Sequence, residues 1–140
     1  MGHKTKEFNR KEIYLSWFLS ISIAILYFQT LFFKFSGAEE SVYIFSKLGA
    51  EPVGRIGSAI AELLISILIL FPKTRAIASL LSIGIISGAV LSHVFLLGIE
   101  ILGDHGLLFF FAMYILISSA ILTYLHREEL IVSLQKIRNR

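Results

Sequence analysis

The chain alternates four long apolar segments with short polar connections. The apolar segments cover residues 13–33, 56–71, 76–98 and 107–125. Each approaches the roughly 20 residues that a helix needs to cross a hydrocarbon core of about 30 Å. The pattern therefore predicts an all-α, multi-pass integral membrane protein, a four-helix bundle in which residues 1–140 form one membrane domain.

Two shorter segments have the pattern of amphipathic helices. Residues 36–39 have the spacing of a capping box, and Val42, Phe45 and Leu48 then recur on one face. Residues 126–140 place apolar side chains on one face and basic side chains opposite. We expect a short outer interfacial helix between the first two spans and an amphipathic C-terminal tail on the cytoplasmic surface.

Lysine and arginine are distributed unevenly between the connections. Only Lys34, Lys47 and Arg55 fall on one side of the predicted bundle, whereas ten fall on the other. Because short basic segments are retained in the cytoplasm, both termini are predicted to be cytoplasmic. The basic residues lie where topology requires them, so a nucleic-acid partner is not expected. The ten are Lys4, Lys6, Arg10, Lys11, Lys73, Arg75, Arg127, Lys136, Arg138 and Arg140.

Composition narrows the classes further. A hydrophobic content of 56% and a mean hydropathy of +0.78 leave too few polar residues to cover a soluble globule. The absence of cysteine excludes disulfides, thiol relays and thiolate metal sites. In the third span, Gly84, Gly88 and Ser92 recur every four residues, which predicts a seam against a neighbouring helix.

Three polar residues fall at similar depth inside the spans. The rise of a helix puts Gln29, Glu62 and His93 each roughly 6–10 Å below the outer end of its helix. A carboxylate at a helix centre costs about 2.5–3.5 kcal/mol, so Glu62 is expected to face the bundle and have a partner. Arg55 lies about 10 Å above Glu62 along the axis, too far to pair directly. We therefore expect Glu62 to share a hydrogen bond with His93 or Gln29, an arrangement that leaves its protonation state open.

Further polar residues lie at the outer ends of the spans. Asp104 is expected to cap the fourth helix by accepting a backbone N–H, and Glu100 and His105 lie beside it. No catalytic residue is assigned. The candidates for ligand binding or proton handling are Glu62, His93, Arg55, Gln29 and His105.

The same residues indicate which cofactors the chain is able to hold. His93 and His105 with nearby acids supply metal-ligand types, but their spacing matches no compact ligand motif, so no metal site is assigned. Haem between these histidines is favoured still less, because no attachment motif is present. A quinone fits better: a His or Glu at a carbonyl oxygen in an apolar slot would position the ring and move its protons.

Several blocks of sequence resemble the DoxX family of small four-helix bacterial membrane proteins. They are residues 35–37 (FSG), Gly57 with Glu62, residues 71–75 (FPKTR), residues 88–93 (GAVLSH) and residues 103–109 (GDHGLLF). The resemblance covers about residues 31–125 and implies a four-helix bundle in the bacterial cytoplasmic (inner) membrane. Because some relatives are subunits of a thiosulfate:quinone oxidoreductase, it also implies a link to quinone-coupled sulfur or oxidative-stress chemistry.

These observations lead to two functional hypotheses. In the first, an outer-leaflet polar pocket binds a small lipophilic ligand, with quinone as the first candidate, and the protein joins redox-complex subunits in the lipid bilayer. In the second, the protein is a non-catalytic membrane scaffold whose buried polar residues only hold the helices together. A proton- or solute-coupled carrier is disfavoured by small size and the lack of repeats, unless the chain forms an oligomer.

Overall fold

The computed structural model describes residues 6–139, which are helical with no strand in that range, as the sequence predicts. Lys4 and Arg140, both assigned to the cytoplasmic side, lie outside the described residues. The elements are α1 (Arg10–Ser36), α2 (Glu39–Lys47), α3 (Val53–Leu68), α4 (Arg75–Ser92), a π-helical turn (His93–Leu97), α5 (Leu107–Leu125) and α6 (Arg127–Arg138).

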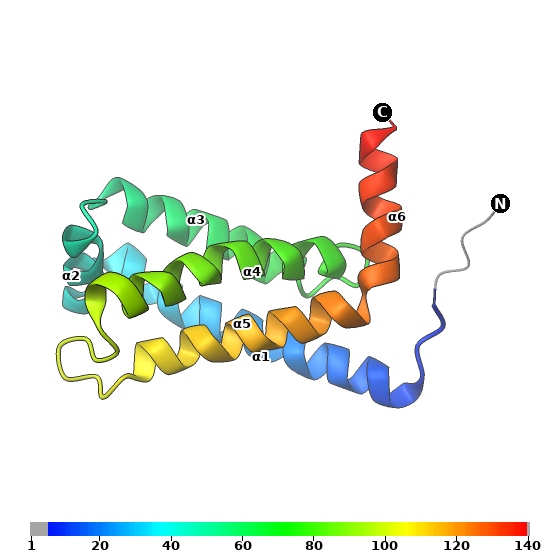
Figure 1. The fold of residues 1–140 in the computed structure, drawn as a ribbon, viewed down its shortest axis with the longest axis horizontal. Helices are drawn as coiled ribbons and strands as arrows, with labels where there is room; N and C mark the ends of the chain where they lie inside the picture. Colours follow the sequence, from blue (N-terminus) through cyan, green and yellow to red (C-terminus); the bar gives the residue numbers. More distant parts are fainter. Residues whose placement is uncertain (1–5, 140) are drawn as a thin grey trace.

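The helices α1, α3, α4 and α5 pack along their lengths (Figure 1). Helix α1 contacts α3 and α5, and α4 contacts the same two helices. The start of α1 and the whole of α6 lie at one end of the molecule, whereas α2 lies at the other end. Helix α6 runs crosswise to the long helices, so it would lie flat on a membrane that the long helices cross.

Three helices are long and apolar enough to cross a membrane. They are α1 with 27 residues, α4 together with its π-helical turn with 23 residues, and α5 with 19 residues. Helix α3 has 16 residues, which makes it the shortest of the four that pack together. Large apolar side chains point outward along the bundle; Phe18, Phe32, Phe95 and Phe110 are 64–75% exposed. A continuous apolar exterior of this kind suits contact with lipid.

The interior carries hydroxyl groups beside apolar side chains. The Tyr27 hydroxyl pairs with Ser82 Oγ at 2.8 Å, and Ser82 pairs with Ser119 at 2.8 Å, which joins α1, α4 and α5. Thr123 donates to Ser79 at 3.0 Å. Such interhelical hydrogen bonds hold membrane helices together where lipid provides no hydrophobic driving force. The buried serines are Ser16, Ser20, Ser41, Ser66, Ser79, Ser82, Ser118 and Ser119.

The predicted interfacial helix is present, but its predicted cap is not. Ala38 occupies the N-cap position of α2, and no side chain caps that helix. Ser36 donates instead to the Phe33 carbonyl at 3.3 Å, because α1 continues through Ser36 and includes this residue in its last turn. Gly37, with φ of +67°, ends α1 in the left-handed conformation that glycine adopts without steric cost.

The predicted glycine seam in α4 is wrong for this chain. Gly84 and Gly88 are exposed, and a Cβ added to either would meet no atom within 4 Å. The inward face of α4 is formed instead by Ser79, Ser82 and Ile86. Serine is small enough to let the helices approach closely, and it supplies the hydrogen bonds that glycine cannot.

Candidate functional site

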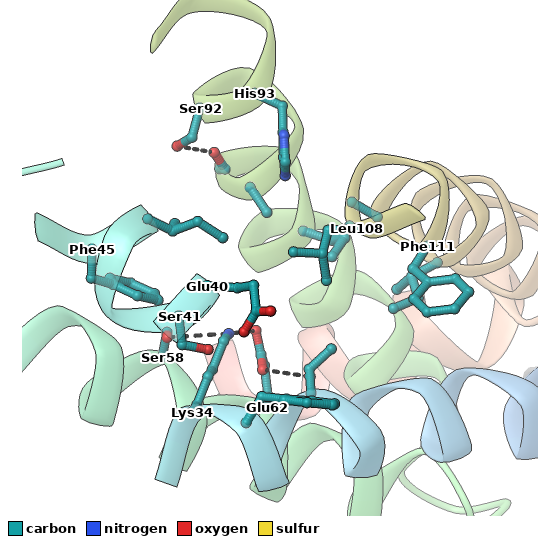
Figure 2. Close-up of a pocket in the computed structure, with 18 of the residues that line it drawn as sticks. Lys34, Glu40, Ser41, Phe45, Ser58, Glu62, Ser92, His93, Leu108 and Phe111 are labelled. Atoms are coloured by element: carbon teal, nitrogen blue, oxygen red, sulfur yellow. Dashed lines mark hydrogen bonds and ion pairs between the residues drawn. The ribbon is translucent and has the colours of Figure 1, made fainter. Parts of the chain in front are cut away.

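A cavity of about 420 Å³ lies at the α2 end of the molecule. Its volume falls in the range of small-molecule sites, which are apolar clefts with a few polar groups. The apolar wall comes from α1, α2, α4, its π-helical turn and α5, whereas α3 contributes Ser58 and Glu62. Figure 2 shows Ser92 and His93 on a different helix from Lys34 and Glu62. The polar and charged lining residues are Tyr27, Gln29, Thr30, Lys34, Glu40, Ser41, Ser58, Glu62, Ser92, His93 and Asp104.

Glu62 pairs with Lys34 at one side of this cavity. Lys34 Nζ lies 2.6 Å from Glu62 Oε1, and Thr30 Oγ1 donates to Oε2 at 3.3 Å. The two charged side chains are only 15% and 6% exposed. Burial of Glu62 with a partner is as predicted, but the expected partners, His93 and Gln29, are wrong. Lys34 belongs to the last turn of α1 and reaches into the cavity, where it also donates to Ser58 at 3.4 Å.

Arg55 lies where the end of α1 meets the start of α3 and does not line the cavity. Its guanidinium lies 2.7 Å from Glu51, one helical turn away, and it also donates to the Lys34 carbonyl. That carbonyl belongs to the last turn of α1, where backbone acceptors have no partner within the helix. Arg55 therefore joins the two helices, and it does not pair with Glu62, as its height predicted.

His93 begins the π-helical turn and is 5% exposed. Its Nδ1 lies 2.8 Å from the Gly98 carbonyl, and its ring meets the edge of Phe109 with 5.6 Å between centroids. A carbonyl only accepts, so Nδ1 carries the hydrogen. A neutral His93 therefore keeps the lone pair on Nε2, and its ring projects toward the cavity (Figure 2).

Asp104 orders the loop before α5. Its Oδ1 accepts from the backbone N–H groups of Ile101 and Gly106 at 2.8 Å, and its Oδ2 accepts from Leu108 at 3.0 Å. Asp104 thus accepts a backbone N–H from the first turn of α5 as expected, but Gly106, and not Asp104, occupies the N-cap position of that helix. Burial raises the pKa of Asp104, but these three backbone donors outweigh it and hold the pKa below its ordinary value.

The remaining two candidates differ in position. Gln29 lines the cavity from α1, although its side chain is exposed. His105 is exposed in the loop before α5 with φ of +54°, and it does not line the cavity. The structure thus brings Gln29, Glu62 and His93 to one cavity and leaves Arg55 and His105 outside it.

Glu40 is a cavity residue that the sequence reasoning missed. It lies in the first turn of α2, and it lines the same cavity as Lys34 and Glu62 (Figure 2). A usable signal was present, because Glu40, Ile44 and Leu48 recur every four residues and so share one helix face. The search for apolar residues identified Val42, Phe45 and Leu48, and it did not consider charged residues in the first turn of the helix.

A second polar cluster lies at the opposite end of the bundle. Arg75 donates to Ser16 Oγ at 3.0 Å, Ser16 contacts His126 Nε2 at 2.8 Å, and His126 Nδ1 lies 3.1 Å from Glu129. Because the Glu129 carboxylate only accepts, a neutral His126 carries its hydrogen on Nδ1, and its Nε2 accepts from the Ser16 hydroxyl. Ser16 is 2% exposed inside α1, where no substrate could reach it, so this serine–histidine–glutamate row attaches α6 to the bundle and is no nucleophilic site.

Between residues 6 and 139, no three His, Asp or Glu side chains gather as they would around a metal ion. A scan of protein-family models, a search of curated proteins and a search of solved structures each found no match to this chain.

Proposed function

We propose that this chain is a DoxX-like membrane protein whose cavity, in the outer leaflet, binds a small lipophilic ligand. The observation that carries the proposal is the cavity itself: apolar walls surround a buried ion pair, a histidine and a carboxylate. A polar group inside a membrane is costly, so a group of them around a cavity is a functional candidate by default.

The proposed topology has four crossings with both termini in the cytoplasm of a bacterium. Helix α3 is short, but it connects the two ends of the bundle. At one end Arg55 contacts the end of α1. At the other, Arg75, the first residue of α4, donates both to Ser16 near the start of α1 and to the carbonyl of Ile69, the residue that follows α3. These contacts support a path in which α3 crosses beside α1. The cavity then opens near the outer surface, and α6 lies on the inner one.

Quinone is the first candidate ligand, and the protein would serve a redox or oxidative-stress assembly as one of its membrane subunits. The chain's own part would be to hold a flat ring between apolar walls such as Phe33 and Phe111 and to place His93 at its polar edge. The quinone supplies the redox chemistry when bound. The sequence resemblance and the cavity's composition support this candidate.

The membrane scaffold is the second candidate function. It is favoured by the Lys34–Glu62 pair, because both charges are satisfied within the protein and join α1 to α3 without any ligand. On that account the cavity would be empty of specific ligand in the cell.

A pair of glycine variants separates the two candidates. Gly88 lines the cavity and Gly84 does not, yet both are exposed positions on α4 with open space beyond Cα. We expect Gly88→Leu to reduce the amount of ligand that copurifies with gently extracted protein by at least about fivefold, since the added side chain occupies space that the ligand needs. Mass spectrometry of extracted lipids and cofactors measures this. Equal ligand content in Gly84→Leu and Gly88→Leu, or no ligand in the unaltered protein, would favour the scaffold.

A further inference from the structure

A second hollow lies on the outside of the bundle, between α1 and α5. It is a groove of about 310 Å³, and all of the surface that lines it is apolar. Two of its side chains, Ile25 and Phe110, are 59% and 70% exposed, so this α1–α5 groove is open to whatever surrounds the bundle. Its lining residues are Ser22, Ile25 and Leu26 of α1 and Phe110, Phe111 and Tyr114 of α5.

The two hydroxyl groups in the α1–α5 groove leave no hydrogen free for a ligand. Tyr114 donates to Ser22 Oγ at 2.9 Å, and Ser22 donates in turn to the Leu19 carbonyl at 3.0 Å. The other four lining side chains are hydrocarbon. Since a polar group placed there would lose its hydrogen bonds to water and find no donor, the groove suits a hydrocarbon chain.

The α1–α5 groove is continuous with the cavity. Phe111 lines both of them. On α1, the cavity residue Gln29 lies seven residues after Ser22, which is two helical turns and therefore the same helix face. On α5, Tyr114 lies seven residues after the cavity residue Leu107 in the same way. The two hollows thus follow one another along a single seam between α1 and α5.

The direction of this seam is the same on both helices. Helix α1 runs toward α2 and α5 runs away from it (Figure 1). Ser22 therefore lies farther from α2 than Gln29 does, and Tyr114 lies farther from α2 than Leu107 does. Because seven residues of helix rise about 10 Å, the groove reaches about that far along the seam from Gln29 and Leu107.

From these observations we infer that the ligand has two parts, a compact polar head in the cavity and a hydrocarbon tail that lies in the α1–α5 groove. The ligand class is thus a head-and-tail lipid and not a compact apolar molecule that the cavity encloses completely. This inference rests on the proposed function, because it specifies the shape of the lipophilic ligand and the place of its tail.

The tail contributes to binding through packing. Lipid chains are as apolar as the groove, so moving the tail between them gives no hydrophobic driving force. The gain comes from dispersion contacts with fixed walls and from the bound head, which keeps the tail at a high effective concentration beside the groove. A change in the shape of the groove should therefore weaken a long-tailed ligand more than a short-tailed one.

The test compares two benzoquinones that differ only in the tail. The full-length protein in detergent is titrated with decyl-substituted and with ethyl-substituted benzoquinone, and relative affinities follow from ligand-induced thermal stabilisation. The chain has no cysteine, so the quinones are not consumed by thiols of the protein. Each probe partitions into micelles equally for every variant, so the ratio of the two affinities is compared between variants.

Ile25→Trp and Ile21→Trp are matched variants on α1. Both isoleucines are exposed, at 59% and 45%, and they lie one turn apart, but only Ile25 lines the groove. The larger side chain of Ile25→Trp takes up groove space and should lower the decyl-to-ethyl affinity ratio by at least about fivefold. Ile21→Trp should leave this ratio unchanged.

A photoreactive probe locates the tail directly. Decyl-benzoquinone whose tail ends in a diazirine is bound to the unaltered protein and irradiated, and labelled peptides are identified by mass spectrometry. We expect the label in residues 22–26 and 110–114, and an excess of unlabelled decyl-benzoquinone should remove it. Ile60 and Leu64 of α3, which are exposed and line neither hollow, are the reference positions and should stay unlabelled.

The outcomes distinguish this inference from the proposed function. An affinity ratio that is unchanged in Ile25→Trp, or a label spread equally over α1, α3 and α5, overturns the inference, while binding of both quinones leaves the proposed function intact. If neither quinone stabilises the unaltered protein and unlabelled quinone does not compete with the photoreactive probe, the proposed function fails and the inference fails with it.

Discussion

At the scale of single residues, the sequence identifies which groups are unusual but not which groups they meet. Glu62 stands out because a carboxylate inside an apolar segment must be buried and paired. Its partner could not be derived, because Lys34 looks like a flanking residue until α1 is known to continue through Ser36. The rotation of α1 about its axis then decides that Lys34 points inward, and rotation depends on the packing of the whole bundle.

Removal of Lys34 tests the importance of this pair. Lys34→Met should destabilise the protein by about 3 kcal/mol, because it leaves the buried Glu62 carboxylate without its cation. The double variant Lys34→Met/Glu62→Met should recover most of that loss. Unfolding in mixed detergent micelles measures both, with the exposed Lys47→Met as control. A Lys34→Met protein as stable as the control would show that the pair contributes nothing to folding.

Asp104 gives a prediction about pH. Its folded pKa is depressed, so its contribution to stability is present above the ordinary pKa of about 3.9 and is lost as pH falls through the lower folded value. Asp104→Asn should therefore be less stable than the unaltered protein at pH 6, and the difference should shrink on acidification to about pH 3. Thermal unfolding across this range measures it. Glu100→Gln, at an exposed position of the same loop, should show no such change, and a gap independent of pH would contradict the assignment.

At the scale of elements, the hydrophobic pattern predicted the positions of the helices well. The prediction that Gly84 and Gly88 form the packed face of α4 was wrong. The apolar segment 107–125 coincides with α5, and α2 and α6 form where the amphipathic pattern predicted short helices. The spacing of Gly84 and Gly88 shows only that close approach is sterically allowed. In a helix that is apolar all round, hydrophobicity gives no preference among faces, and the buried serine hydroxyls decide which face turns inward.

The corrected position of Gly84 changes the expected effect of its substitution. Because the site is exposed and helical with open space beyond Cα, Gly84→Ala should raise the free energy of unfolding by up to about 1 kcal/mol through its higher helix propensity. Unfolding in mixed micelles checks the sign. Destabilisation together with a smaller particle on size-exclusion chromatography would instead mean that this face of α4 packs against a second copy of the chain.

At the scale of the whole molecule, polar chemistry is concentrated at the two ends and joined by hydroxyls in between. The α2 end holds the cavity, and the other end holds the Arg75–Ser16–His126–Glu129 row that attaches α6. Composition and charge predicted a polar outer layer and a basic inner surface. They could not predict the second row, because its members are far apart in the sequence and only the antiparallel course of the helices brings Ser16 beside His126.

The orientation of the chain can be tested with single cysteines, since the natural sequence contains none. Ser46→Cys in α2 and Glu100→Cys in the loop before α5 should react with a membrane-impermeant maleimide on intact cells or spheroplasts. Lys73→Cys and Arg138→Cys should react only after permeabilisation; all four positions are exposed. The result distinguishes four crossings from three, because each crossing moves the next connection to the other side of the membrane. If α3 did not cross, only three helices would span the membrane, residues 46, 73 and 138 would share the outer side, and Glu100→Cys would be protected. That pattern would move the cavity away from the outer leaflet and would contradict the four-crossing proposal.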